Sequence, residues 1–389
     1  MDQGLPAAWH GAYQPPPCVV SECGVKGNGL LATRGIAEGE VVFTECPRVC
    51  VTLSAVPHCA HCCRSTAPPL PGLPADSLQH WPSPATVTCP ECDEHYCSEQ
   101  CAAAAVRYHR VLCGGARSLQ AAVAAVPATA KDELMEYFEE EAEAEAEAQP
   151  LAQLAKAHAA ARLRAYCGEF ACGALERCAE YPLMALKLIA MALSELRSGL
   201  RNTATTPSFE DALVGAGELP WGTYATATGR QGPKAMDSAI IWPLIVEATS
   251  MSTAEQAWAG GEPAVELILG VLCANGIRIT PRSPFDIFMA RIRQEGNDHR
   301  RAAVRLAVEN LVKSAHEAKG DGGQGDAARP CAAGEMDDLI RGMCAVSVGA
   351  LYAAHSKINH SCDFNCEVQG YHFDNCLIQV SADNLRIPF

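Results

Sequence analysis

Cysteine and histidine side chains crowd one stretch of the chain at spacings that favour metal binding. Zinc accepts four thiolate or imidazole ligands, and a Cys-x2-Cys turn lets two thiolates reach one ion. Eight candidate ligands therefore predict two tetrahedral zinc sites. They are Cys59, Cys62, Cys89, Cys92, Cys97, Cys101, His109 and Cys113. His61 and Cys63 crowd the first pair, so the sequence leaves its register open by one residue.

A helix must carry the last of these ligands. The segment SEQCAAAAVRYHRVLC, residues 98–113, predicts one in which residues three or four apart share a face. Cys101 then points inward from one turn, and His109 and Cys113 point inward together from a later turn. The spacing of the ligands and the predicted helix agree.

Other segments predict both strands and helices. Residues 30–46 (LLATRGIAEGEVVFTEC) predict two short strands joined by a turn at Glu38-Gly39. Apolar residues recur at helical spacing in 151–167 and 181–196. A helix followed by an extended segment is predicted for AVELILGVLCANGIRI. A strand pair with a turn near Asp374-Asn375 is predicted for YHFDNCLIQVSA. The acidic run at 139–148 predicts a linker or a solvated helix end. The Gly-rich stretch at 320–330 predicts a surface loop.

Length, charge and cysteine usage limit the classes of protein. A chain of 389 residues has room for two or three packed units. A net charge of −15 disfavours direct binding to nucleic acid and favours basic protein partners. With 21 cysteines and no signal-like start, we expect reduced thiols and metal sites. No apolar stretch in the sequence is of membrane-spanning length. We expect the protein to lie in the nucleus, the cytoplasm or both.

Two alternatives compete with a two-zinc module. The cysteines could be buried free thiols, or the cluster could be a RING-type ubiquitin ligase module. A RING module has a histidine between its middle cysteines and a final Cys-x2-Cys, whereas this cluster ends in His-x3-Cys. His95 is only an approximate match to the RING histidine.

The eight positions, the Tyr96-Cys97 pair and the ending HRVLC resemble a MYND zinc finger. The ligands interleave in that family. The resemblance therefore implies one ion on Cys59, Cys62, Cys97 and Cys101 and a second on Cys89, Cys92, His109 and Cys113. It also implies that the finger recruits protein partners through proline-containing peptides.

Two further motifs flank the finger. KGNGL at 26–30 and NHSC at 359–362 together resemble a SET domain, with Phe364 where a proline is usual. A SET domain interrupted by a MYND finger and a helical segment resembles the SET and MYND domain family of protein-lysine methyltransferases, in a divergent branch that includes plant and algal homologues. This implies an α+β fold of small curved sheets. The implied domains are an N-terminal SET segment at 18–52, the finger at 59–113, a helical insertion at 114–340 and a C-terminal SET segment at 341–389.

The resemblance implies transfer of methyl groups from S-adenosylmethionine to a lysine of a histone or another basic protein. Lysine methylation requires a deprotonated amine aligned with the methyl–sulfur axis and shielded from water. The family's cofactor contacts map onto Lys26, Asn28, Gly29, Asn275, Asn359 and His360. We expect a monomer that binds neither membrane nor nucleic acid.

No catalytic residue is assigned from the sequence. The given sequence ends with VSADNLRIPF, before the positions of the family's Gly-Glu-Glu-Leu and tyrosine motif and its last cysteines. An incomplete C-terminal SET segment leaves a second hypothesis open, an inactive scaffold that recruits partners through its finger. Tyr352 and Tyr371 are predicted to be half-buried strand aromatics.

Overall fold

The computed structural model describes most of the finger and the parts that pack around it. The described residues are 17–22, 28–82, 86–113, 156, 159–167, 179–199, 238–318, 340, 342–358, 366–369 and 378–382. The acidic run and the Gly-rich stretch lie outside them.

The strands are β1 Cys18–Glu22, β2 Asn28–Ala32, β3 Val41–Glu45, β4 Val49–Val51, β5 Val87–Thr88, β6 His95–Tyr96, β7 Gly276–Ile279, β8 Val348–Leu351, β9 Cys366–Gln369 and β10 Ile378–Ala382. The helices are α1 Glu99–Leu112, α5 Tyr181–Gly199, α7 Ser238–Thr249, α8 Thr253–Ala259, α9 Glu262–Asn275, α10 Pro284–Glu295 and α11 Asp298–Ala318, with short 3-10 turns η2 Ala75–His80 and η6 His355–Lys357.

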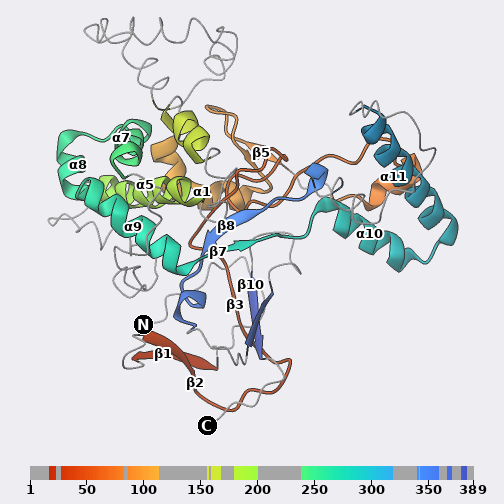
Figure 1. Cartoon of the computed structure of the whole chain (residues 1–389), viewed down its shortest axis with the longest axis horizontal. Coiled ribbons are helices and arrows are strands. Elements are labelled where there is room, and N and C mark those ends of the chain that lie inside the picture. Colours follow the sequence, from red (N-terminus) through yellow and green to blue (C-terminus); the bar gives the residue numbers. More distant parts are fainter. Residues whose placement is uncertain are drawn as a thin grey trace, which may run out of the picture.

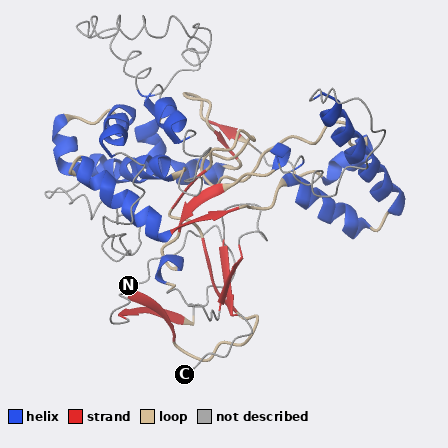
Figure 2. Cartoon of the chain, in the orientation of Figure 1, coloured by secondary structure: helices blue, strands red, loops and turns tan. Residues whose placement is uncertain are grey.

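Helices and small antiparallel sheets make up the described residues, which confirms the predicted mixture of the two (Figure 2). The sheets have the strand orders β1-β2, β3-β10-β9, β4-β8-β7 and β5-β6. Three of the predictions for individual segments hold. Residues 98–113 contain α1, residues 181–196 lie within α5, and α9 passes directly into the extended strand β7.

A central sheet joins three distant parts of the sequence. β8 lies between β4 and β7, although about 300 residues separate β4 from β8. Side chains alternate across the sheet, so that Val49 and Val51 face the core around α5 while Cys50 faces a second core. β7 falls within the segment 114–340 that the sequence predicted to be a helical insertion. That segment therefore contributes a strand to the sheet built from the two flanking segments.

Two glycines let α5 lie close to this sheet. A Cβ atom at Gly349 would come within 2.9 Å of the Glu180 Cβ, and one at Gly276 would come within 2.9 Å of the Tyr181 hydroxyl. Arg278, on the same face, donates to both carboxylate oxygens of buried Glu180 at 2.9 Å. The start of α5 is thus fixed against the sheet by close packing and by an ion pair.

The predicted strands at 30–46 do form, with a turn at Glu38-Gly39 where Gly39 has a φ of 72°. The two strands nevertheless belong to different sheets: β2 pairs with β1, and β3 pairs with β10. Of the strand pair predicted at 371–382, only the second strand is described, as β10, and it pairs with β9, which lies wholly before the predicted segment. Its turn at Asp374-Asn375 lies outside the described residues.

A helical layer covers one side of the central sheet. α1, α5, α7 and α9 share one apolar core, with α5 at its centre (Figure 1). Of the predicted helix at 151–167, residue 156 and residues 159–167 are described, and all of them are helical. No single described helix is long and apolar enough to cross a membrane, whereas α8 and α9, bent by 45°, meet that test together.

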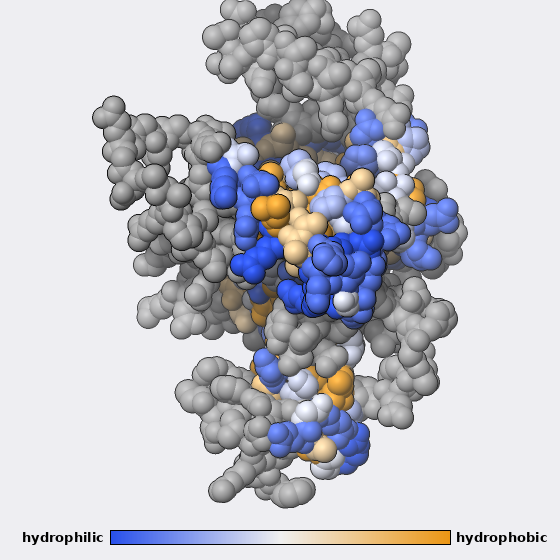
Figure 3. All heavy atoms as spheres, turned by 90° about the vertical axis from the view of Figure 1, so that its right-hand side faces the viewer, coloured by the Kyte–Doolittle hydropathy of each residue, from blue (hydrophilic) through white to orange (hydrophobic). Residues whose placement is uncertain are grey.

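The residues between the first two cysteine pairs pack against α10 and α11 and form a second lobe. The Trp81 ring lies 5.5 Å from the Phe288 ring, and its indole N–H donates to the Ala67 carbonyl at 3.1 Å. Arg291 and Arg300 of the two helices contact His80 and Asp76 of η2. The outer face of this lobe is largely hydrophilic, with few exposed apolar residues such as Leu306 (Figure 3).

Candidate metal centre

Two tight turns present the paired cysteines in the same backbone conformation. In the first knuckle, residues 59–64, the Cys63 N–H donates to the Cys59 carbonyl at 2.9 Å and the Cys59 N–H donates to the Arg64 carbonyl at 2.8 Å. The second knuckle, residues 89–94, repeats both bonds at 3.1 and 2.9 Å, from Asp93 and Cys89. Cys63 and Asp93 occupy the same place in each turn, with φ values of 54° and 60°. The shared geometry places both members of each Cys-x2-Cys pair on one side of its turn.

The helix α1 supplies the other half of each group. Ser98 caps its start, because the Ser98 hydroxyl accepts the Cys101 N–H at 3.2 Å. Cys97 lies directly before this cap and Cys101 in the first turn, so both face the first knuckle. His109 and Cys113 lie at the other end of the helix and face the second knuckle.

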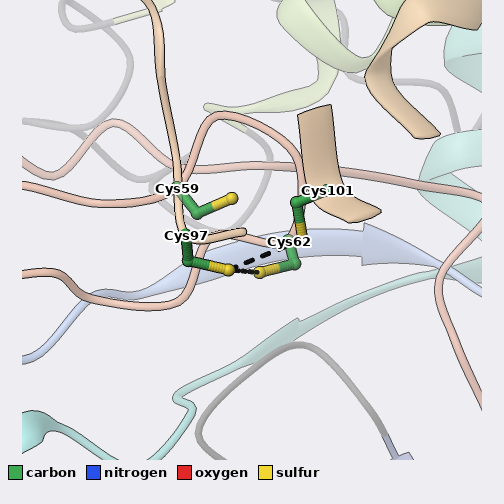
Figure 4. A group of neighbouring side chains, drawn as sticks. All are labelled: Cys59, Cys62, Cys97 and Cys101. Atoms are coloured by element: carbon green, nitrogen blue, oxygen red, sulfur yellow. Dashed lines mark hydrogen bonds between the residues drawn. The ribbon is translucent and has the colours of Figure 1, made fainter. Parts of the chain in front are cut away.

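Cys59, Cys62, Cys97 and Cys101 form the first group, and their sulfur atoms all lie within 4.8 Å of one another (Figure 4). The Sγ of Cys97 is 3.6 Å from that of Cys62 and 3.5 Å from that of Cys101. Two thiolates on one tetrahedral zinc lie about 3.8 Å apart, given Zn–S bonds of about 2.3 Å. These distances fit shared coordination, and they are far longer than a disulfide bond of about 2.0 Å.

Cys89, Cys92, Cys113 and His109 form the second group. The His109 Nε2 is 3.3 Å from the Cys89 Sγ and 3.6 Å from the Cys92 Sγ, and the sulfurs of Cys89 and Cys113 are 3.9 Å apart. A thiolate and an imidazole nitrogen on one zinc lie about 3.6 Å apart. Both groups therefore have the donor set and the spacing of a structural zinc site.

A carboxylate orients the histidine of the second group. The Glu94 Oε2 lies 3.1 Å from the His109 Nδ1 and accepts the Tyr96 hydroxyl at 3.0 Å. A histidine that binds metal through Nε2 commonly donates its other N–H to a carboxylate, which fixes the ring and strengthens the ligand. Glu94 therefore leaves Nε2 as the nitrogen that faces the three cysteines.

Hydrogen bonds within the groups lower the pKa of some thiols and raise the pKa of the thiols that donate to them, such as Cys62 and Cys101. Bonds from Cys101 and Cys62 lower the pKa of Cys59. Burial acts to raise the pKa of Cys89, but bonds from His109 and from backbone amides outweigh it and lower the pKa to about 7. The hydrogen bond to Glu94 raises the pKa of His109.

The structure settles the register of the first knuckle. The Cys63 Sγ points away from the cysteine group and lies 3.7 Å from the Cys50 Sγ in the second core. The His61 ring stacks on Tyr108 with 6.1 Å between centroids. Cys59 and Cys62 are thus the pair that faces Cys97 and Cys101.

The residues that the family resemblance assigns to the cofactor are described only in part. Lys26, Asn359 and His360 lie outside the described residues, as do Cys362 and Tyr371. Asn28 and Gly29 lie in β2, and Gly29 is buried. Asn275 ends α9, where its buried amide donates to the Val271 carbonyl at 2.8 Å.

The structure also changes the prediction for Tyr352, which follows β8. It is fully buried rather than half-buried, and its ring lies edge-on to His355 at 6.2 Å. The turn η6 that follows lies against β2, the strand that contains Gly29 (Figure 1).

Comparison with known proteins supports the family resemblance. No protein-family model matches the chain. Among curated proteins it is similar to the protein-lysine N-trimethyltransferase SMYD5 of mouse, at 38% identity over 109 residues, and of human, at 39% over 108 residues. The zebrafish protein of the same name is 36% identical over 109 residues. The resemblance to SET and MYND domain proteins is confirmed. Each match covers 23% of this chain and 26% of the relative, so the chain matches about a quarter of the length of these proteins.

Two residues that support the MYND-like finger were not predicted from the sequence. Glu94 is the last residue of the second knuckle, and an acidic residue that close to two candidate ligands, Cys89 and Cys92, is the signal that would have identified it. Lys187 is the one charged residue in the apolar stretch YPLMALKLIAMAL of α5. Its Nζ donates to the carbonyls of Ala60 and Cys50 at 2.8 and 3.1 Å and lies 4.9 Å from the centre of the Tyr108 ring. Lys187 thereby fixes the finger to both α5 and β4.

Replacing Glu94 by glutamine should weaken zinc binding at the second group without abolishing it. The amide is a poorer acceptor for the His109 N–H, and loss of such a partner typically costs about 10- to 100-fold in metal affinity. Competition with a chromophoric chelator measures this affinity. Glu91→Gln, an exposed change in the same knuckle, is the matched control. Equal affinities for the two variants would show that Glu94 does not support the site.

Proposed function

We propose that this protein is an S-adenosylmethionine-dependent protein-lysine N-methyltransferase whose MYND-like finger holds two zinc ions. The observation that carries the proposal is the interleaved pair of four-residue groups, together with the similarity to curated lysine methyltransferases. Zinc has a structural role in it. Each group supplies four protein ligands and so leaves no coordination position for a substrate.

The cofactor site in this proposal lies between the KGNG strand and the NHSC segment. η6 packs against β2, and the His355 Nδ1 is buried without a hydrogen-bond partner among the described residues. A buried polar atom of this kind fits a site that a polar ligand completes. S-adenosylmethionine would supply the methyl group. Lys26, Asn28, Gly29, Asn275, Asn359 and His360 are the residues proposed to hold it.

The proposed substrate is a lysine in a histone or another basic protein, because the chain carries a net charge of −15. The proposed partners of the finger are proline-containing peptides. A monomer in the nucleus or the cytoplasm remains our expectation.

The test is a titration of the purified zinc-loaded protein with S-adenosylmethionine, followed by transfer of a labelled methyl group to histones and to other lysine-rich proteins. We expect saturable binding and methyl-lysine in the product by mass spectrometry. His360→Ala should lose the cofactor, whereas His299→Ala, an exposed change on α11, should keep it.

Three outcomes separate the hypotheses. Binding together with transfer supports the enzyme. Binding without transfer to any protein supports the inactive scaffold, which recruits partners through its finger. Absence of both binding and transfer overturns the proposed function.

A further inference from the structure

A carboxylate from the N-terminal part of the chain holds the turn that leads into the NHSC segment. Glu45 is the last residue of β3. Its Oε1 accepts the Ala354 N–H at 2.8 Å, and its Oε2 accepts the His355 N–H at 3.0 Å. Glu45 and this turn are more than 300 residues apart in the sequence. The side chain therefore connects the two segments that flank the finger.

The later backbone N–H groups of the turn have acceptors among nearby backbone carbonyls. The N–H groups of Ser356, Lys357 and Ile358 donate to carbonyls three or four residues earlier, at 3.3, 3.0 and 2.9 Å. No side chain of the turn caps the start of η6. The amides of Ala354 and His355 would be left without an acceptor, and Glu45 supplies one oxygen to each. A charged acceptor makes these bonds stronger than those to a neutral group.

The position of the turn determines where the following residues begin. η6 lies against β2, which contains buried Gly29, and Lys357 at its end is only 2% exposed. Asn359 follows Lys357 by two residues. Tyr352, fully buried at the start of the turn, fixes its other end. The carboxylate of Glu45 thus ties this turn to the sheet β3-β10-β9, against which Ile358, directly after the turn, also packs.

We propose that Glu45 is a positioning residue for the cofactor site. It holds the turn 353–357, which lies against β2 and directly precedes Ile358, Asn359 and His360 in the sequence. The inference rests on the proposed function, because it assigns Glu45 to the same cofactor site. Glu45 itself need not touch the cofactor, since its two oxygens are occupied by the turn.

The test compares Glu45→Ala and Glu45→Gln with wild-type protein, all loaded with zinc. Calorimetric titration gives the dissociation constant for S-adenosylmethionine, and hydrogen exchange gives the protection of individual amides. We expect Glu45→Ala to bind the cofactor about 10-fold more weakly or worse, because two bonds to a charged acceptor are lost. Glu45→Gln keeps one acceptor oxygen and should lie between Glu45→Ala and wild type.

Glu40→Gln is the matched control. The Glu40 carboxylate also accepts a backbone amide, that of Ala37 at 2.9 Å, but it lies in the turn between β2 and β3 and pairs with Arg34. We expect wild-type cofactor binding for this variant. Zinc content should be unchanged in all three variants.

Exchange at Ala354 and His355 should accelerate in Glu45→Ala, while the amides that join β3 to β10 keep their protection. Unchanged cofactor binding in Glu45→Ala would overturn the inference. Loss of protection throughout β3 and β10 would also overturn it, since Glu45 would then stabilise the fold rather than the turn. If the wild-type protein binds no cofactor, the proposed function fails, and the positioning role of Glu45 fails with it. Weaker binding confined to the Glu45 variants supports both the proposed function and the positioning role of Glu45.

Discussion

Replacing Cys62 by serine should reduce the zinc content from two ions per chain to one. Cys62 is one of four sulfur ligands in the first group, and a serine hydroxyl does not replace a thiolate on zinc. Binding of a structural zinc ion contributes on the order of 10 kcal/mol to the folding of a small domain, so loss of one ion should also loosen the finger. Elemental analysis of the purified protein after dialysis measures the stoichiometry.

Cys63→Ser is the matched control, because Cys63 is adjacent in sequence but faces Cys50 in the second core. We expect this variant to keep both ions and to lose only the modest stability of a buried thiol contact. The opposite result, one ion in Cys63→Ser and two in Cys62→Ser, would place the register of the first knuckle one residue later.

Replacing Gly276 by alanine should destabilise the whole fold by about 3 kcal/mol, as expected for overpacking at a rigid position. The added Cβ would lie 2.5 Å from the Leu272 carbonyl and 2.9 Å from the Tyr181 hydroxyl. Neither α9 nor α5 can move away easily, because both are packed in the same core. Denaturant-induced unfolding followed by circular dichroism measures the change.

The control for Gly276 is Gly35→Ala, at an exposed loop position where an added Cβ would meet nothing within 4 Å. We expect its unfolding midpoint to equal that of the wild type within error. A Gly276→Ala variant as stable as Gly35→Ala would show that α5 and α9 lie farther from the sheet than described.

The two groups of candidate ligands could be predicted from the sequence because the geometry that joins their members is local. A Cys-x2-Cys turn and a helix with ligands near each end fix most of the distances within about 15 residues. The neighbours of Cys62 were harder to predict. Cys63 and His61 have the right side chains, and only the backbone turn shows that Cys63 points into the second core while His61 stacks on Tyr108.

The sheet partners could not be predicted in the same way. The residues at 30–46 predict two strands, but a strand pattern carries no information about which distant strand will lie beside each of them. The turn at Glu38-Gly39 joins the two strands in sequence, yet β2 pairs with β1 and β3 pairs with β10. For the same reason, the contact of Glu45 with Ala354 and His355 could not be predicted.

The central sheet has a consequence for biosynthesis. The partner of β4 is β8, whose first residue is made about 300 residues after β4 ends. At a translation rate of about 5–20 residues per second, roughly 15–60 s pass before β4 can pair. All eight finger ligands lie between residues 59 and 113, so the finger can capture its metal early in this interval. The nascent chain therefore carries a formed finger beside unpaired strand edges, and that interval is when the protein most needs protection from aggregation.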